Sequence, residues 1–106
     1  YNLFTFSGAG TITFPPRNAV IIYKNPALST AAPVLSLLEV ELSLGGTVLT
    51  NTDLTATLSS TESGHPASHC IDGDVSTTDD YCSTDSSDSD PRLTVATTDN
   101  KLFNKF

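Results

Sequence analysis

The residues best suited to chemistry lie in the 67–83 segment, where oxygen-bearing side chains alternate around a glycine between two cysteines. Asp72, Asp74 and Ser76 stand at every second position, so a tight turn at Gly73 brings their oxygens toward one centre. Hard oxygen ligands at this spacing suit calcium. The same aspartates can instead cap the turn by hydrogen bonding to the local backbone. The spacing alone leaves both interpretations open.

Cys70 and Cys82 flank this turn and are the only cysteines in the chain. A disulfide between them would restrict the unfolded chain and stabilise the fold by roughly 2–3 kcal/mol. Two buried free thiols are an alternative. Zinc is another, because His65 and His69 lie nearby, although no Cys-x-x-Cys pair is present. An oxidised pair would place the protein in an extracellular space, on a cell surface or on an assembled particle.

Three motifs occur in order between residues 54 and 95: Ala-Thr-Leu-Ser-Ser-Thr (56–61), Ile-Asp-Gly-Asp-Val-Ser-Thr (71–77) and Asp-Pro-Arg-Leu-Thr-Val (90–95). Together they resemble the discoidin family, also called F5/8 type C or galactose-binding-like domains. Ordered motifs at matching spacing are more specific than one Asp-Gly-Asp triplet. The chain departs from the family pattern at a tryptophan, in whose neighbourhood it has Tyr81.

The resemblance implies an antiparallel β-sandwich of the jelly-roll type, with one structural calcium ion and a ligand site on loops at one end. It implies the following calcium ligands: Asp72, Asp74 and Thr77. A glycan or a glycosylated surface is the expected ligand, because family members of this type bind such surfaces. Sugars need an aromatic face and planar hydrogen-bonding groups, which four residues would supply here: His65, His69, Tyr81 and Arg92.

Two noncatalytic functions are therefore considered, the first as the expected function and the second as the alternative. The first is a calcium-stabilised binding or adhesion module for carbohydrate or glycoprotein. The second is a structural β-sandwich subunit of an extracellular fibre, wall or virus particle, assembling with other chains or with copies of itself through strand edges. The missing tryptophan and the abundance of serine and threonine favour the second.

Enzyme activity is not expected from this sequence. It contains no Gly-x-Ser-x-Gly nucleophile motif and no glycine-rich phosphate loop between a strand and a helix. The net charge of −7 argues against nucleic-acid partners and anionic membranes, which both require a positive surface. No apolar stretch approaches the length of a membrane span.

The elements that must position these residues are predicted to be strands. A chain of 106 residues is long enough for one core, and its β-branched and hydroxyl residues favour sheets. Residues 1–17 are expected to form an N-terminal hairpin or assembly arm that ends at Pro15-Pro16, and residues 18–106 a partial or permuted discoidin-like sandwich. Further strands are expected at residues 19–23, 38–42, 47–50, 54–59, 92–96 and 102–106.

Three of these expectations concern particular side chains. The apolar run at residues 19–23 predicts a buried strand, and Gly45-Gly46 predicts a hairpin. In residues 38–42, Glu39 and Glu41 alternate with apolar residues, which predicts that both glutamates face water. Residues 60–90 are rich in turn formers and are expected to be the functional loop region.

Overall fold

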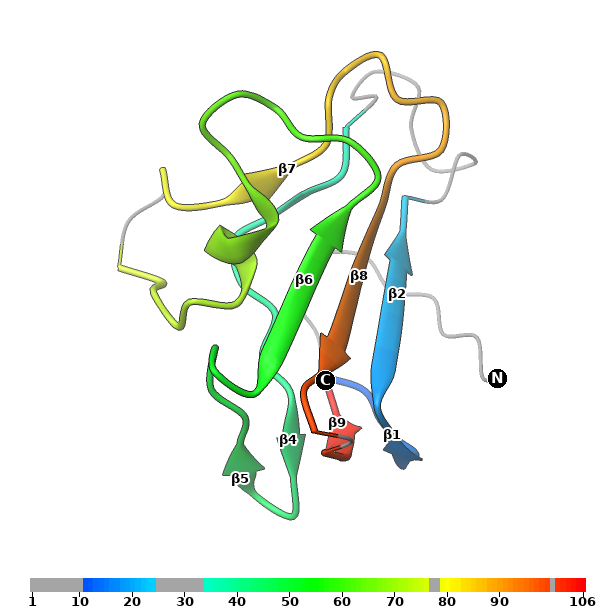
Figure 1. Cartoon of the computed structure of the whole chain (residues 1–106), viewed down its shortest axis with the longest axis vertical. Helices are drawn as coiled ribbons and strands as arrows, with labels where there is room; N and C mark the ends of the chain where they lie inside the picture. Colours follow the sequence, from blue (N-terminus) through cyan, green and yellow to red (C-terminus); the bar gives the residue numbers. More distant parts are fainter. Residues whose placement is uncertain (1–10, 25–33, 77–78, 100) are drawn as a thin grey trace.

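The computed structural model describes residues 11–24, 34–76, 79–99 and 101–106. Its regular structure is antiparallel β-sheet with one short 3-10 helix, η1 (Ala67–Cys70), so the predicted all-β sandwich class is confirmed (Figure 1). The jelly-roll connectivity and the partial or permuted character of residues 18–106 stay predictions. Among the described residues, no helix has the length and apolar character needed to cross a bilayer. The strands are β1 (Thr13–Arg17), β2 (Ala19–Tyr23), β3 (Ser36–Leu37), β4 (Ser43–Leu44), β5 (Thr47–Val48), β6 (Leu54–Leu58), β7 (Cys82–Ser83), β8 (Arg92–Thr97) and β9 (Phe103–Lys105).

Strand β8 is the centre of a three-stranded sheet with the order β2-β8-β6. It pairs antiparallel with both neighbours, and Leu93 lies opposite Ile22 on one side and Leu58 on the other. Leu93 and Val95 are fully buried, because alternate side chains of a strand point to the same face. The alternation in the sequence therefore supplies one apolar face to the core.

Strand β2 has the predicted bounds, but the prediction that it is buried is wrong. Ile22 is buried and Val20 is half-buried, whereas Ile21 and Tyr23 are 49% and 54% exposed. The physical reason is that the β2-β8-β6 sheet packs one face on the core and leaves the other face largely in water. A continuous apolar run cannot distinguish this arrangement from burial on both faces.

A second sheet has the order β1-β9-β4-β5 and contributes the buried ring of Phe103 from β9. Strand β1 runs through Pro15-Pro16, so the prediction that these prolines end the strand is wrong. Prolines are tolerated in β1 because it is an edge strand, and its register with β9 is irregular. Residues 1–10 of the predicted N-terminal hairpin lie outside the described residues.

The Gly45-Gly46 hairpin is confirmed, with both glycines at positive φ between β4 and β5. The predicted strand at residues 38–42 is wrong, because the structure has a short β3 before it and no strand over these residues. Val40 is buried here, but its N–H donates to the carbonyl of Cys70 at 2.7 Å instead of to a neighbouring strand. Residues 38–42 therefore pack on the core without pairing to a strand, which accounts for their strand-like pattern of apolar residues.

The core lies between the two main sheets and the loop region, and all three contribute to it. The β2-β8-β6 sheet contributes aliphatic side chains from each of its strands, and Phe103 packs from the second sheet. The loop region contributes Cys70, Ile71 and Cys82. Loop residues are therefore part of the core of this small domain, which fixes the position of the side chains beside them.

Truncation of the central strand should be costly. Leu93→Ala removes buried methyl groups from a fully buried site, so we expect the free energy of unfolding to fall by about 2–5 kcal/mol. Thr57→Ala, at an exposed position of β6, is the control and should change it by less than about 0.5 kcal/mol. Urea denaturation followed by circular dichroism measures both. Equal effects of the two variants would contradict the described packing.

Candidate functional site

A disulfide between Cys70 and Cys82 closes the loop that carries the predicted chemistry. Their Cα atoms are 5.4 Å apart, and both residues are buried. Cys70 is the last residue of η1 and Cys82 the first of β7. The predicted disulfide is confirmed, and the free-thiol and zinc alternatives are wrong because each sulfur is bonded to the other.

The turn after η1 is capped by its own aspartates. The Asp72 Oδ1 accepts a hydrogen bond from the Asp74 N–H at 2.9 Å, across Gly73 at a φ of 79°. The Asp74 Oδ1 accepts from the hydroxyl and the N–H of Ser76, at 2.5 and 2.8 Å, and these bonds hold the pKa of Asp74 below its ordinary value. Thr77, the third predicted calcium ligand, lies outside the described residues. The capped turn is thus present, and a calcium ion on it stays a prediction.

Three carboxyl groups gather beside this turn. Asp72 lies close enough to both Glu39 and Asp80 to raise their pKa values, and these residues come from different parts of the chain. The Glu39 Oε1 accepts from the Gly73 N–H at 3.2 Å, while its Oε2 is buried without a partner among the described residues. The prediction that Glu39 faces water is therefore wrong. The bond from Val40 to Cys70 holds residue 39 against the loop.

This crowding changes the protonation of the cluster. Burial above all, together with the nearby Asp72 and Asp80, raises the pKa of Glu39 to about 7, against the lowering effect of the Gly73 N–H. Partial burial and contact with Asp72 also raise the pKa of Asp80. Near neutral pH the cluster therefore holds a proton that an isolated pair of carboxylates would release. A bound cation is another way to relieve such repulsion.

His69 lies at the edge of the carboxyl cluster. Its Nδ1 is 3.1 Å from the Asp80 Oδ1, and both side chains are partly exposed. In the part of the chain that the structure describes, no three His, Cys, Asp or Glu side chains converge as ligands of a bound metal ion do. As it stands, the cluster can share protons and accept hydrogen bonds from a polar ligand.

His65 and Tyr81 form an aromatic stack, and Tyr81 directly follows Asp80 in the chain. Their ring centroids are 3.8 Å apart and the rings are inclined by 13°. The backbone of His65 is held from both sides, because its N–H donates to Glu62 and its carbonyl accepts from Ser83. Both side chains are half-buried, so each retains exposed ring surface. The structure thus brings together two of the residues predicted to contact sugar.

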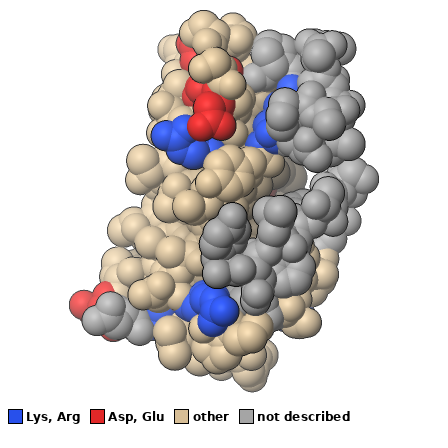
Figure 2. Space-filling view, turned by 90° about the vertical axis from the view of Figure 1, so that its right-hand side faces the viewer, with Lys and Arg blue, Asp and Glu red and all other residues tan. Residues whose placement is uncertain are grey.

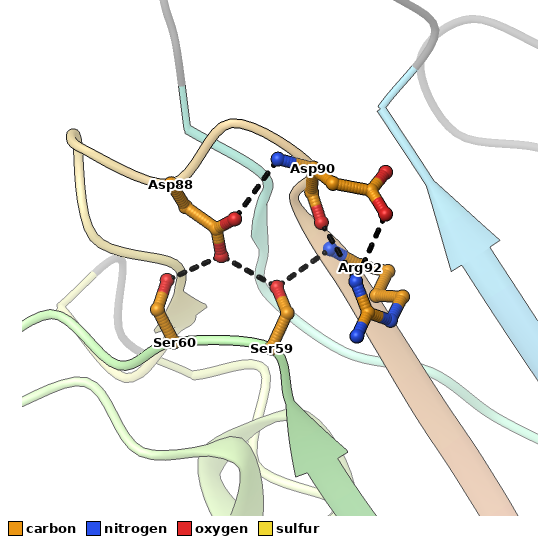
Figure 3. Close-up of polar contacts among 5 residues, drawn as sticks. All are labelled: Ser59, Ser60, Asp88, Asp90 and Arg92. Atoms are coloured by element: carbon orange, nitrogen blue, oxygen red, sulfur yellow. Dashed lines mark hydrogen bonds and ion pairs between the residues drawn. The ribbon is translucent and has the colours of Figure 1, made fainter.

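Arg92 belongs to a different group of side chains (Figure 3). Its Nη1 donates to the carbonyl and the Oδ2 of Asp90, at 3.1 and 3.0 Å, and its backbone N–H donates to the Ser59 Oγ at 3.0 Å. The hydroxyls of Ser59 and Ser60 donate to Asp88, whose pKa these bonds lower. Among the described residues, the contacts of Arg92 join the end of β6 to the start of β8. They do not reach the aromatic stack.

Two members of the cluster, Glu39 and Asp80, were not among the residues predicted from sequence. Asp80 carried a usable signal, because it lies two residues before Cys82 and the disulfide brings that position beside η1. No sequence signal pointed to Glu39, because its neighbours in the cluster are more than thirty positions away in the chain. Its hydrogen bond to Gly73 shows this separation. Sequence alternation assigned it to the wrong face.

Comparison of the chain with protein-family models, with curated proteins and with solved structures finds no match. The resemblance to discoidin domains therefore rests on the sequence motifs alone. The function has to be argued from the loop geometry: a disulfide, a carboxyl cluster and an aromatic stack within one region.

The raised pKa of Glu39 predicts a pH-dependent stability. The contribution of the protonated group is fully present below its ordinary pKa of 4.5 and is lost as pH rises through about 7 in the folded protein. Glu39→Gln should remove this loss and exceed the wild type by about 1–3 kcal/mol above pH 7, with little difference below pH 4.5. Denaturation of both proteins across this range measures the difference. Glu41→Gln, at an exposed site, is the matched control, and an equal effect there would refute the assignment.

Proposed function

We propose that this domain is a noncatalytic, extracellular binding module that recognises carbohydrate or a glycosylated surface through the loops around its disulfide. The observation that carries this proposal is the His65–Tyr81 stack, whose Tyr81 directly follows Asp80 of the carboxyl cluster. The two features share one stretch of chain, because Asp80, Tyr81 and Cys82 are consecutive. A ligand in this region would meet an aromatic face and charged hydrogen-bonding groups together.

The chemistry of a sugar fits these groups. A pyranose has a face of C–H groups that packs on an aromatic ring, and hydroxyls that need donors and acceptors around the rim. Tyr81 and His65 supply the ring surface, while Asp80 supplies acceptors and His69 a donor. Arg92 is left out of the proposed contacts, because it is held in the group formed with Asp90 and Ser59.

Calcium is proposed as the stabilising ion of the same loop, with a changed ligand set. Asp72 lies near both Asp80 and Glu39. These three carboxylates repel one another when ionised, and a hard divalent cation would neutralise them if side-chain rotations brought their oxygens together. Asp74 is better explained as a turn cap, since one of its oxygens already accepts two bonds from Ser76.

The alternative function is a structural subunit that assembles through strand edges. One observation favours it: β2 is an edge strand of five residues with exposed apolar side chains. Assembly and sugar binding would use different parts of the molecule, because β2 does not contribute to the disulfide loop.

Thermal melts with calcium and with a chelator test the cation proposal. Above the pKa of Glu39 we expect calcium to raise the melting temperature, because a ligand bound only by the folded state stabilises it. Asp80→Asn should abolish this rise, whereas Asp74→Asn should lower the melting temperature equally in both conditions. Asp90→Asn, outside the loop, is the control. Identical wild-type melts with calcium and chelator would refute the proposal.

Glycan binding is tested separately. On an array of neutral and acidic glycans, the wild-type chain should bind at least one class, and Tyr81→Ala should weaken that binding by about tenfold or more through loss of the stacking face. Arg92→Ala should retain it. Circular dichroism of each variant checks that the fold is intact. Absence of any glycan binding by the folded wild type would contradict the proposed ligand class.

A further inference from the structure

Among the described residues, the outer edge of β2 presents unpaired backbone groups. At its two ends, the N–H of Thr97 donates to Asn18 at 2.9 Å and the N–H of Lys24 donates to Pro91 at 3.3 Å. Hydrogen-bonded pairs of an antiparallel ladder recur at every second residue, so the even-numbered residues of β2 bond to β8. The N–H and carbonyl groups of the odd-numbered residues therefore point away from the sheet: Ala19, Ile21 and Tyr23.

The other described sheet edges are blocked or short. Strand β1 has two prolines, which have no N–H to donate. Strand β5 is two residues long, and β6 packs against η1 (Figure 1). Natural sheets use such devices to prevent strand pairing between molecules. Within the described residues, β2 has none of them, because its sequence Ala-Val-Ile-Ile-Tyr contains no proline and no charge.

The surface along this edge is apolar. Ile21 and Tyr23 are 49% and 54% exposed, and both side chains lie on the outer face of the sheet. Figure 2, which shows this side of the molecule, has Lys and Arg side chains at an upper and a lower position, with Asp and Glu side chains beside the upper ones and uncharged surface below them.

We propose that two copies of this chain associate by antiparallel pairing of β2 with β2, about a two-fold axis at Ile21. The pattern of the edge is self-complementary, because the three outward-facing residues are symmetric about Ile21. Ala19 lies opposite Tyr23 of the second copy, and each outward N–H meets an outward carbonyl. The two Ile21 side chains lie opposite each other on the outer face, where a β-branched pair stabilises the contact.

The pairing would join two three-stranded sheets into one continuous sheet of twice that size. It rests on the alternative function of assembly through strand edges, which it makes specific to β2 and a second copy, and it requires neither calcium nor sugar. If the disulfide loop binds glycans, a two-fold dimer carries two such loops, and binding to a dense glycan surface would be strengthened by multivalency. A negative glycan-binding result would not count against the dimer, and a monomeric protein would not count against glycan binding.

Sedimentation equilibrium of the 106-residue chain over a range of concentrations tests the proposal. We expect a monomer–dimer equilibrium for the wild type. Ile21→Pro removes an N–H that points away from β8, so it leaves the intramolecular ladder intact and should weaken dimerisation by about tenfold or more. Ile21→Lys, which sets two ammonium groups opposite each other across the axis, should act in the same direction and serves as the second variant if the proline perturbs folding.

Thr57→Lys is the matched control, because Thr57 is exposed on β6 in the same cross-strand row as Thr94 and Ile21. It adds the same charge to the sheet but away from the proposed axis, and it should leave the dimer unchanged. A wild type that stays monomeric at the highest concentration would overturn the proposal. So would open-ended association, or a dimer that survives Ile21→Lys.

Discussion

The buried Cys70–Cys82 disulfide fixes the part of this chain that has the least regular structure. Between β6 and β8, the described chain forms one turn of 3-10 helix and a two-residue strand. Few ladder hydrogen bonds are available to hold such a segment. Both cysteines are instead packed in the core, and the carbonyl of Cys70 accepts a bond from Val40. Covalent closure and burial therefore replace the sheet as the support of the loop.

This support has an electrostatic consequence. Packing Cys70 and Ile71 in the core brings the following turn against residue 39, and the disulfide brings Asp80 to the same place. The carboxyl groups are crowded by the demands of the core and not by attraction between themselves. A local arrangement that costs stability is tolerated where the surrounding structure fixes it, and such places are where function is to be sought.

The sequence was a good guide to features that depend on neighbouring residues. An apolar run located β2, residue patterning located β6 and β8, the glycine pair located the β4–β5 hairpin, and cysteine spacing located the disulfide. The sequence was a poor guide where the place of a strand in the folded sheet decides. Whether Pro15-Pro16 interrupts a strand depends on that strand being at an edge, and the exposure of Ile21 depends on which face of its sheet packs on the core. The strand prediction for residues 38–42 was wrong because an irregular segment packed on the core shows the same alternation as a strand.

The candidate site was predictable in the same uneven way. His65, Tyr81 and the capped turn were identified from residue types and spacing. Glu39 belongs to the candidate site through a contact with Gly73 that no local sequence pattern encodes. Arg92 is not part of the site, because its hydrogen bonds are made with Asp90 and Ser59 instead. Residue type indicates what a side chain can bind, and its tertiary neighbours determine whether it is available.

The position of β9 constrains how the protein can be made. This strand lies inside its sheet, between β1 and β4, although it is the last strand in the described chain. During synthesis, β1 and β4 leave the ribosome long before the strand that joins them exists. The sheet can therefore close only after Lys105 has emerged, and until then the pocket for Phe103 stays open to water. Until then the open strand edges and the apolar core residues are exposed to contact with other chains.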